Sequence, residues 1–324
     1  MEINKIYNEP CLETLKKMPD NFVDCIITSP PYWQLRDYGY DGQWGLESTF
    51  QKYLEHLWSM MDEIYRVLKS TGTVWINLGD TYARTGGNSI GKKQPNALLG
   101  NTQKGIRGGN CHGVEGIKDK CLLLIPHRFA IGCIDRGWIV RNDIVWAKRN
   151  GMPESCTDRF SKKHEYFFFM VKSEKYHFDL DSIRDSIKPV SIKRYKYKFT
   201  GQEGGNSNNF KGDKSHLIPK TSGNECTLII DGKNPGSVAD FWDIPTKPST
   251  NEHYASYNDE LIRKPILAGC PEGGIVYDPF MGTGSTAEVC LRSKRLFIGS
   301  EMSEKYVEIA NKRLEPFLMQ QTLF

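Results

Sequence analysis

The segment VYDPFMGTGSTAEVC constrains the fold most, because it predicts a strand that ends near Tyr277, a glycine turn and a helix that starts near Ser285. In the turn, Gly282 and Gly284 let the backbone approach a ligand closely, and the helix start offers free N–H groups. The next predicted strand, LFIGSE, ends on Glu301, where a carboxylate can accept hydrogen bonds from both hydroxyls of a ribose. Together these features indicate a nucleoside cofactor.

Two other interpretations of the glycine turn remain open at this point. A tight turn can need glycine for its geometry alone, although this interpretation leaves Glu301 without a function. A dinucleotide such as NAD would favour a glycine turn near the N-terminus, followed by the whole nucleotide-binding half of the fold. Here the turn comes late in the chain, so its position needs another explanation.

The first part of the chain alternates short strands with helices. The runs VDCIIT and TVWINL predict buried strands, and apolar residues from Phe50 to Leu68 lie on one helical face between them. Ser48 and Gln51 suit a capping box before this helix, and Gly72 suits its end. Further along, LLLIPHRFAIGCIDRG predicts a helix, and WIVRNDIVWAK and HEYFFFMVKS predict two strands. Strand, helix and strand in this order predict an α/β fold with a parallel, doubly wound sheet.

Composition limits the class of protein. The 324 residues are 39% hydrophobic and 25% charged, which suits one large globular domain or a domain with a sizeable insertion. The formal net charge of +4 neither proves nor opposes a polyanionic partner.

The nine cysteines form no C-x-x-C pair and no Cys/His cluster with zinc-ligand spacing, so we expect reduced thiols and no metal. The apolar runs are too short to cross a bilayer and the first residues lack a signal-peptide core, which predicts a soluble cytoplasmic protein.

A second motif, TSPPYW from Thr28 to Trp33, follows the first buried strand. Together with DPFMGTG it resembles the beta class of S-adenosylmethionine-dependent DNA amino-methyltransferases, in which the catalytic motif precedes the cofactor motif. The resemblance covers almost the whole chain, and it explains why the glycine turn comes late. It implies a Rossmann-like methyltransferase fold, with a mostly parallel seven-stranded sheet, helices on both faces and a DNA-recognition insertion. Without DPFMGTG, a polyproline-type loop with buried aromatic residues would explain SPPYW equally well.

The resemblance makes Ser29, Pro30, Pro31 and Tyr32 the predicted catalytic residues. An exocyclic amino group of a base is a poor nucleophile, because its lone pair is delocalised into the ring, so it needs acceptors that hold its hydrogens. The Ser29 hydroxyl and the Pro30 carbonyl can be those acceptors, and the two prolines fix the backbone. The base must leave the duplex to reach them, and Tyr32 offers a flat ring for stacking. No covalent intermediate is required.

The same resemblance assigns S-adenosylmethionine to the glycine motif and to the segment EHYASYNDEL, which would close over the methionine end of the cofactor. The predicted cofactor-binding residues are Asp278, Phe280, Gly282, Gly284, Ser285, Thr286, Glu301, His253, Ala255, Ser256 and Leu261. Before the catalytic strand, the family commonly has an acidic turn whose carboxylate meets the cofactor adenine. This chain has Pro10 in that place, so either Glu9 replaces the contact or the contact is absent.

Serine at the first position of the tetrapeptide, after a threonine, resembles the cytosine-N4 branch of the family. We therefore expect site-specific methylation of cytosine N4 in duplex DNA, with adenine N6 as the alternative. Methylation of RNA or protein by a related fold, and a catalytically silent DNA-binding protein, are more distant alternatives. The expected partners are double-stranded DNA and a cognate restriction endonuclease in a bacterial or phage-infected cell; no membrane partner is expected.

Two irregular basic regions are candidates for DNA contact. We expect residues 1–186 and 249–324 to form the catalytic domain, with a basic loop at about 81–120, and residues 187–248 to form the target-recognition insertion. In the insertion, KPVSIKRYKYKF interleaves cations with aromatic rings, which suits phosphates and base edges. A solvated basic hairpin would have the same composition. The predicted DNA-binding residues are Lys193, Arg194, Lys196 and Lys198 and, in the basic loop, Arg107.

Overall fold

The computed structural model describes residues 1–83, 116–151, 154–186, 238–246 and 258–321. The chain divides into two compact units, one formed by Met1–Asp179 with Asp240–Phe324 and the other by Leu180–Ala239. In the second unit, the described part contains the short 3₁₀ helix η1, Asp181–Ile183. The fold and the site described below belong to the first unit. Most of the predicted recognition insertion and of the predicted basic loop lies outside the described residues.

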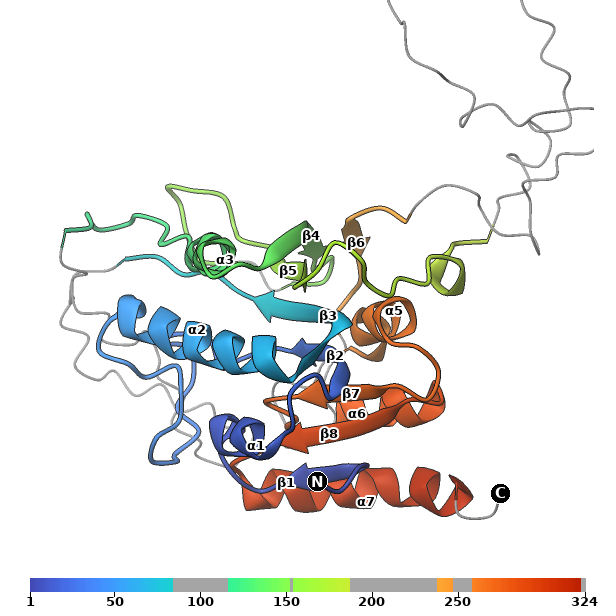
Figure 1. The fold of residues 1–324 in the computed structure, drawn as a ribbon. Helices are drawn as coiled ribbons and strands as arrows, with labels where there is room; N and C mark the ends of the chain where they lie inside the picture. The colour runs from blue at the N-terminus through green and yellow to red at the C-terminus, as the bar shows by residue number, and fades with distance from the viewer. Residues whose placement is uncertain (84–115, 152–153, 187–237, 247–257, 322–324) are drawn as a thin grey trace, which may run out of the picture. The chain divides into compact units, whose positions relative to one another are not determined.

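The strands of the first unit form one sheet in the order β1-β8-β7-β2-β3-β5-β4-β6 (Figure 1). Neighbouring strands are parallel except in the pairs β3–β5 and β4–β5. This arrangement confirms the predicted α/β fold with a mostly parallel sheet. The strands are Lys5–Tyr7 (β1), Val23–Thr28 (β2), Leu68–Leu78 (β3), Ile139–Ala147 (β4), His164–Val171 (β5), Phe241–Asp243 (β6), Ile275–Asp278 (β7) and Leu296–Ser300 (β8).

The described sheet has eight strands, whereas the resemblance implied seven. Both edge strands are only three residues long: β1 pairs with β8, and β6 pairs with β4. A strand this short has no clear alternation in its sequence, so it could not be predicted from the pattern. By contrast, every residue of β2 is buried, as expected for a central strand of a parallel sheet covered on both faces.

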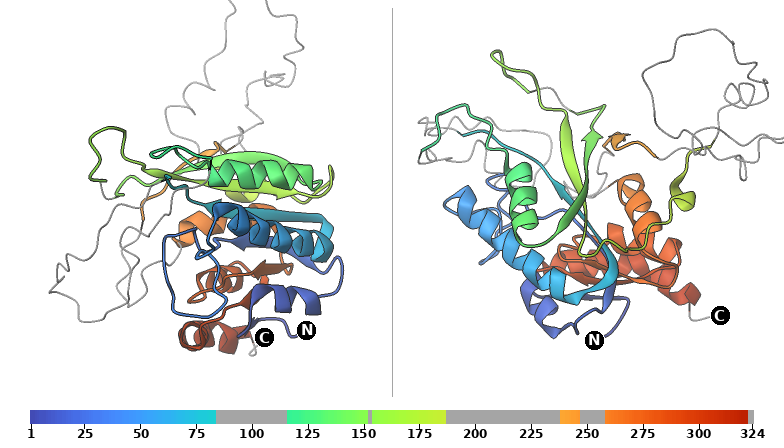
Figure 2. Two further views of the ribbon diagram at one scale, coloured as in Figure 1. Left: turned by 90° about the vertical axis from the view of Figure 1, so that its left-hand side faces the viewer. Right: turned by 45° about the horizontal axis from the view of Figure 1, so that its top comes forward.

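Helices cover both faces of the sheet (Figures 1 and 2). One hydrophobic core lies between the sheet and the helices α1 (Cys11–Lys17), α2 (Phe50–Val67) and α3 (Ile125–Asp135). A second core lies between the sheet and the helices α5 (Asp259–Gly269), α6 (Ser285–Arg292) and α7 (Glu304–Gln321). In the part of the chain that the structure describes, no helix combines the length and the apolar character needed to cross a membrane.

The predicted amphipathic helix is confirmed as α2, but both of its ends differ from the prediction. Thr49 is the N-cap in place of Ser48, because its side chain accepts a hydrogen bond from a first-turn amide at 3.3 Å. The predicted stop at Gly72 is wrong, since β3 begins at Leu68 directly after the helix. Gly72 lies within that strand, where a side chain would collide with Leu68.

One edge of the sheet collects the carboxyl ends of β2, β3, β7 and β8, which face left in Figure 1. Strand β4 ends and β5 begins at the same edge, because Ala147 pairs with His164. The predicted catalytic motif follows β2, and the glycine turn follows the neighbouring strand β7. Ligands of open α/β sheets bind outside this edge, so the two motifs meet where a ligand site is expected.

Candidate active site

A cavity of about 500 Å³ lies at this edge of the sheet. Its wall contains predicted residues from both motifs: Ser29, Pro30, Pro31, Tyr32, Phe280, Gly282, Ser285 and Glu301. The two motifs are more than 240 positions apart in the sequence, and the pairing of β2 with β7 brings them together. The cavity has the size of an ordinary small-molecule site.

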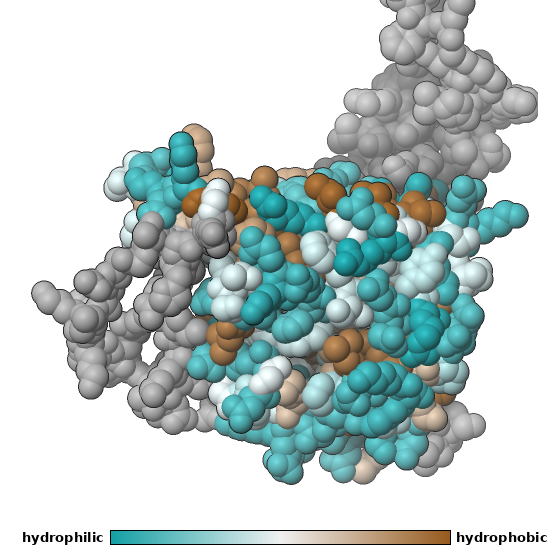
Figure 3. Space-filling model, turned by 60° about the vertical axis from the view of Figure 1, so that its left-hand side comes forward, coloured by the Kyte–Doolittle hydropathy of each residue, from teal (hydrophilic) through white to brown (hydrophobic). Residues whose placement is uncertain are grey.

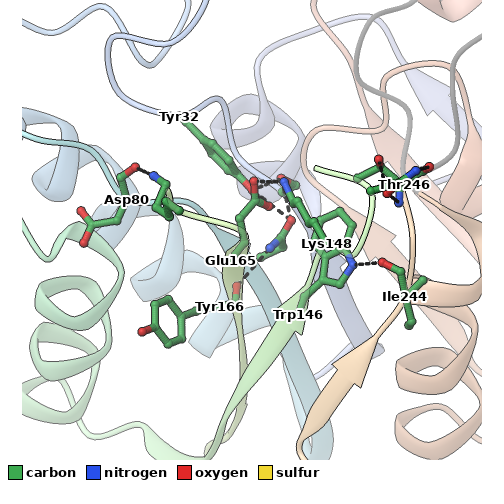
Figure 4. A network of polar contacts seen from close by, with 12 residues as sticks. Tyr32, Asp80, Trp146, Lys148, Glu165, Tyr166, Ile244 and Thr246 are labelled. Carbon is green, nitrogen blue, oxygen red and sulfur yellow. Dashed lines mark hydrogen bonds and ion pairs between the residues drawn. The ribbon is translucent and has the colours of Figure 1, made fainter. Parts of the chain in front are cut away.

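The SPPY motif is held by hydrogen bonds to the end of β3 and the start of β5 (Figure 4). The Tyr32 hydroxyl lies 3.0 Å from Asn77 Oδ1 and 2.8 Å from Glu165 Oε2. The Ser29 hydroxyl lies 3.4 Å from the Tyr32 hydroxyl and 3.5 Å from Asn77 Oδ1. Asn77 is itself fixed, because its amide nitrogen donates to the Tyr166 carbonyl at 3.0 Å. Asn77 therefore presents an acceptor oxygen to both hydroxyls of the motif.

Glu165 connects this network to a lysine. Its second oxygen pairs with Lys148 Nζ, which also lies 4.4 Å from the centre of the Trp146 ring. The Trp146 indole donates to the Ile244 carbonyl at 2.8 Å, so the ring is fixed against β6 and the segment after it. All three side chains line the cavity. The charge of Glu165 is thus balanced by Lys148, while its other oxygen remains the acceptor for Tyr32 (Figure 4).

The glycine turn has the open backbone that a ligand needs. Gly282 has a φ of +56°, and a Cβ at this position would meet no atom within 4 Å. The Glu301 carboxylate accepts hydrogen bonds from the Gly282 amide at 2.9 Å and the Ser303 amide at 2.8 Å. Burial raises the pKa of Glu301 above its ordinary value, and these amides oppose the rise. Each carboxylate oxygen has a second lone pair, so it can still accept a ligand hydroxyl.

Asp278 joins the two motifs through its hydrogen bonds. Its carboxylate accepts hydrogen bonds from the Thr28 hydroxyl at 2.7 Å, the Thr286 hydroxyl at 2.6 Å and the Phe280 amide at 3.0 Å. Burial raises the pKa of Asp278 from 3.8 to about 6, although these hydrogen bonds lower it. Because Thr28 directly precedes the SPPY motif, Asp278 fixes the position of the catalytic motif relative to the glycine turn.

This raised pKa predicts a pH-dependent contribution to stability. Between pH 3.8 and about 6 the folded protein holds the Asp278 proton more tightly than the unfolded chain does, so its contribution falls as pH rises, by at most about 3 kcal/mol. We expect the free energy of unfolding of wild type, minus that of Asp278→Asn, to fall from pH 4 to pH 7. Urea unfolding at several pH values measures this difference. A difference that is constant over the range would contradict the prediction.

The segment after the SPPY motif, residues 34–45, forms a further part of the cavity wall. The Tyr40 hydroxyl lies 2.7 Å from the Ser303 hydroxyl, close after β8. The Trp44 ring packs edge-on against Phe280, with 5.4 Å between ring centres. This segment therefore connects the catalytic motif directly to the residues around the glycine turn.

Four predicted cofactor residues are described but do not line the cavity: Asp278, Gly284, Thr286 and Leu261. Asp278 and Thr286 bond to each other beneath it, and Leu261 is fully buried in the core. Gly284 has a φ of +82°, and a Cβ there would lie 3.0 Å from Ala310 of α7. For these four residues, contact with the cofactor stays a prediction. The residues His253, Ala255, Ser256, Arg107, Lys193, Arg194, Lys196 and Lys198 lie outside the described residues.

Sequence reasoning missed Asn77, Lys148 and Glu165. The sequence contains a signal that could have found them, because each is a polar residue within two positions of the start or end of an apolar strand. Glu9 also lines the cavity, and its carboxylate accepts the Thr14 hydroxyl at 2.9 Å. Within the described ranges, no group of three or more His, Cys, Asp or Glu side chains could hold a metal ion.

Comparison with known proteins identifies the family. The DNA methylase profile of N6 and N4 methyltransferases matches residues 23–312. The chain belongs to the N6/N4 DNA methylase family. The type II methyltransferase M.Cfr9I of Citrobacter freundii is 36% identical over 317 residues, which cover 97% of this chain and 89% of that protein. The type II methyltransferase M.SmaI of Serratia marcescens is 33% identical, with 93% of this chain and 87% of that protein covered.

Solved structures share the DNA methylase fold. The PvuII DNA methyltransferase (cytosine-N4-specific) superposes with a TM-score of 0.61 at 17% identity, over 95% of this chain and 85% of that chain. A putative DNA modification methylase of Thermus thermophilus, solved in complex with S-adenosyl-L-methionine, has a TM-score of 0.55 at 17% identity, over 97% and 93% of the two chains. This protein is a DNA methyltransferase. The open backbone at Gly282 and the Glu301 carboxylate in the cavity wall fit the predicted cofactor, S-adenosylmethionine.

Proposed function

We propose that this DNA methyltransferase modifies the N4 amino group of a cytosine that has been flipped out of duplex DNA. The observation that carries the proposal is the serine that opens the tetrapeptide, Ser29, in the same cavity as the glycine turn. A hydroxyl at this position is a neutral acceptor, as in the cytosine-N4 branch that the motif resembles. When bound, S-adenosylmethionine supplies an electrophilic methyl group.

The geometry supports an acceptor role for Ser29. The Tyr32 hydroxyl has one proton, which it can donate to Glu165 at 2.8 Å. The Ser29 hydroxyl can then donate to the Tyr32 oxygen or to Asn77 Oδ1, both within 3.5 Å. Its lone pairs remain available for an amino hydrogen, and Pro30 lines the same cavity. We infer that the network holds the two acceptors ready before the base arrives.

A second feature supports a rigid stacking surface. A Cβ at Gly79 would lie 2.7 Å from a carbon of the Tyr32 ring, so the missing side chain makes room for the ring at the end of β3. The Tyr32 hydroxyl is in addition bonded to Asn77 and Glu165. A ring fixed by its packing on Gly79 and by its hydroxyl offers a flat face to a flipped base, whose unstacking must be compensated.

Nucleoside mass spectrometry tests the base assignment. The purified protein is incubated with labelled S-adenosylmethionine and unmethylated genomic DNA, and the DNA is digested. We expect label in N4-methylcytosine. Label in N6-methyladenine would keep the acceptor mechanism and overturn the base, whereas the absence of any methylated nucleoside would contradict the proposed function.

We also propose that the protein works in a restriction–modification system with a cognate endonuclease, because its relatives are named type II methyltransferases. The recognition role of residues 187–248 and the DNA contacts of Lys193, Arg194, Lys196, Lys198 and Arg107 remain predictions. Genomic DNA from cells that produce this protein should resist that endonuclease, and DNA from cells without it should be cut.

A further inference from the structure

The loop between β4 and β5, described at residues 148–151 and 154–163, exposes a phenylalanine almost completely. Phe160 is 97% exposed, more than the other exposed large hydrophobic side chains of the described residues. The loop is yellow-green in Figure 2 and projects beyond the sheet. Single exposed apolar side chains are ordinary on protein surfaces, so exposure alone does not indicate a function.

The contacts around Phe160 hold it outward. Arg159 pairs with Glu154 and lies 4.1 Å from the centre of the Tyr82 ring. The Ser161 hydroxyl accepts from the Glu154 amide at 3.3 Å and closes the loop on the other side. Both chain neighbours of Phe160 are therefore tied to the body of the loop, and the ring between them has no apolar surface to cover. These polar contacts leave the ring exposed to solvent.

The position of the loop relates Phe160 to the active site. The loop begins at Lys148 and ends just before Glu165, and both of these residues line the cavity. Phe160 precedes Glu165 by five residues, so the two Cα atoms are at most about 18 Å apart. The Lys162 ammonium bonds to the Asp80 carbonyl, which ties the same stretch to the end of β3 (Figure 4).

The surroundings favour a polyanion over an apolar protein surface. The loop carries five Lys or Arg against two acidic residues. Lys163 and Arg149 are exposed, and Arg149 pairs with Asp243 of β6. The side of the molecule that comes forward in Figure 3 is mainly hydrophilic, with hydrophobic residues in small separate patches. A lone ring among cations suits a nucleic acid, in which phosphates meet the cations and bases meet the ring.

We propose that Phe160 inserts into the base stack of the DNA next to the flipped base. Flipping leaves a gap and costs stacking energy, and an apolar wedge compensates by filling the gap. The ring enters from the loop that carries Lys148 and precedes Glu165, so insertion and the capture of the base occur at the same edge of the sheet. The inference rests on DNA methylation and not on which base is methylated.

Single-turnover methylation of two duplexes tests the wedge. Both duplexes carry the base that the protein methylates in genomic DNA. In one duplex this base is paired, and in the other it lies opposite an abasic position. Phe160→Ala should lower the rate on the paired duplex about tenfold or more, because the gap is no longer filled. On the second duplex the base is already unpaired, so the rate should stay within about twofold of wild type. Phe160→Trp should keep the wild-type rate on both.

Ile131→Ala is the matched control, since Ile131 is 59% exposed on α3. It should leave both rates unchanged. Equal losses by Phe160→Ala on the two duplexes would indicate an ordinary contact and overturn the wedge, as would a wild-type rate on the paired duplex. Sedimentation of wild type and Phe160→Ala tests whether the ring instead contacts a second copy of the chain. A dimer that depends on Phe160 would assign the ring to that contact and overturn the wedge.

Discussion

Replacing Ser29 with alanine is expected to lower the single-turnover rate of methyl transfer about 100- to 1,000-fold, because one of two preorganised partners of the amino group is lost. The Ser29 hydroxyl lies in the cavity wall within 3.5 Å of Tyr32 and Asn77, which can accept its proton. The dissociation constant of S-adenosylmethionine should not change, since Ser29 is not part of the glycine turn. Rapid-quench methylation measures the rate, and calorimetric titration measures cofactor binding.

Ser59→Ala is the control for this substitution. Ser59 is exposed on α2, and its hydroxyl donates to the Glu55 carbonyl at 2.9 Å, away from the cavity. This variant should methylate DNA at the wild-type rate. A wild-type rate for Ser29→Ala would remove the serine from the chemistry, and a parallel loss of cofactor affinity would assign it to the cofactor instead.

Short segments of sequence predicted the parts of the site that depend on local geometry. Glycine is needed at Gly282 for its positive φ and its open backbone, and the helix after it begins at Ser285 as predicted. The apolar run of β2 predicted a buried strand with the catalytic motif directly after it. These features depend on residues a few positions apart, so periodicity and turn chemistry are sufficient to find them.

The supporting contacts could not be predicted, because their partners are far apart in the sequence. Tyr32 meets Asn77 across 45 positions and Glu165 across 133, and Thr28 meets Asp278 across 250. Only the strand order of the sheet makes these residues neighbours. Asp278 illustrates the consequence: the motif predicted a residue of the cofactor site, but it could not predict that Asp278 is buried and that its hydrogen bonds connect both motifs.

Replacing Tyr32 with alanine is expected to lower the rate about 100- to 10,000-fold, because both the stacking face and the hydroxyl are lost. Tyr32→Phe keeps the ring and should cost only about 10- to 100-fold, the typical effect of losing a hydrogen bond to a charged group. The difference between the two variants measures stacking alone. Cofactor affinity should stay close to wild type in both, and single-turnover methylation on unmethylated DNA measures the rates.

A double-mutant cycle identifies the group through which the Tyr32 hydroxyl acts. If it acts through Glu165, Tyr32→Phe and Glu165→Gln together should cost little more than the worse single change, since the first removes the hydrogen bond of 2.8 Å and the second removes the charge of its acceptor. Losses that add would mean that the two groups act independently. Glu165→Gln also leaves Lys148 without its charged partner, so Lys148→Gln reports that effect separately. A wild-type rate for Tyr32→Ala would contradict base stacking altogether, because a ring that can be removed without loss cannot hold the flipped base.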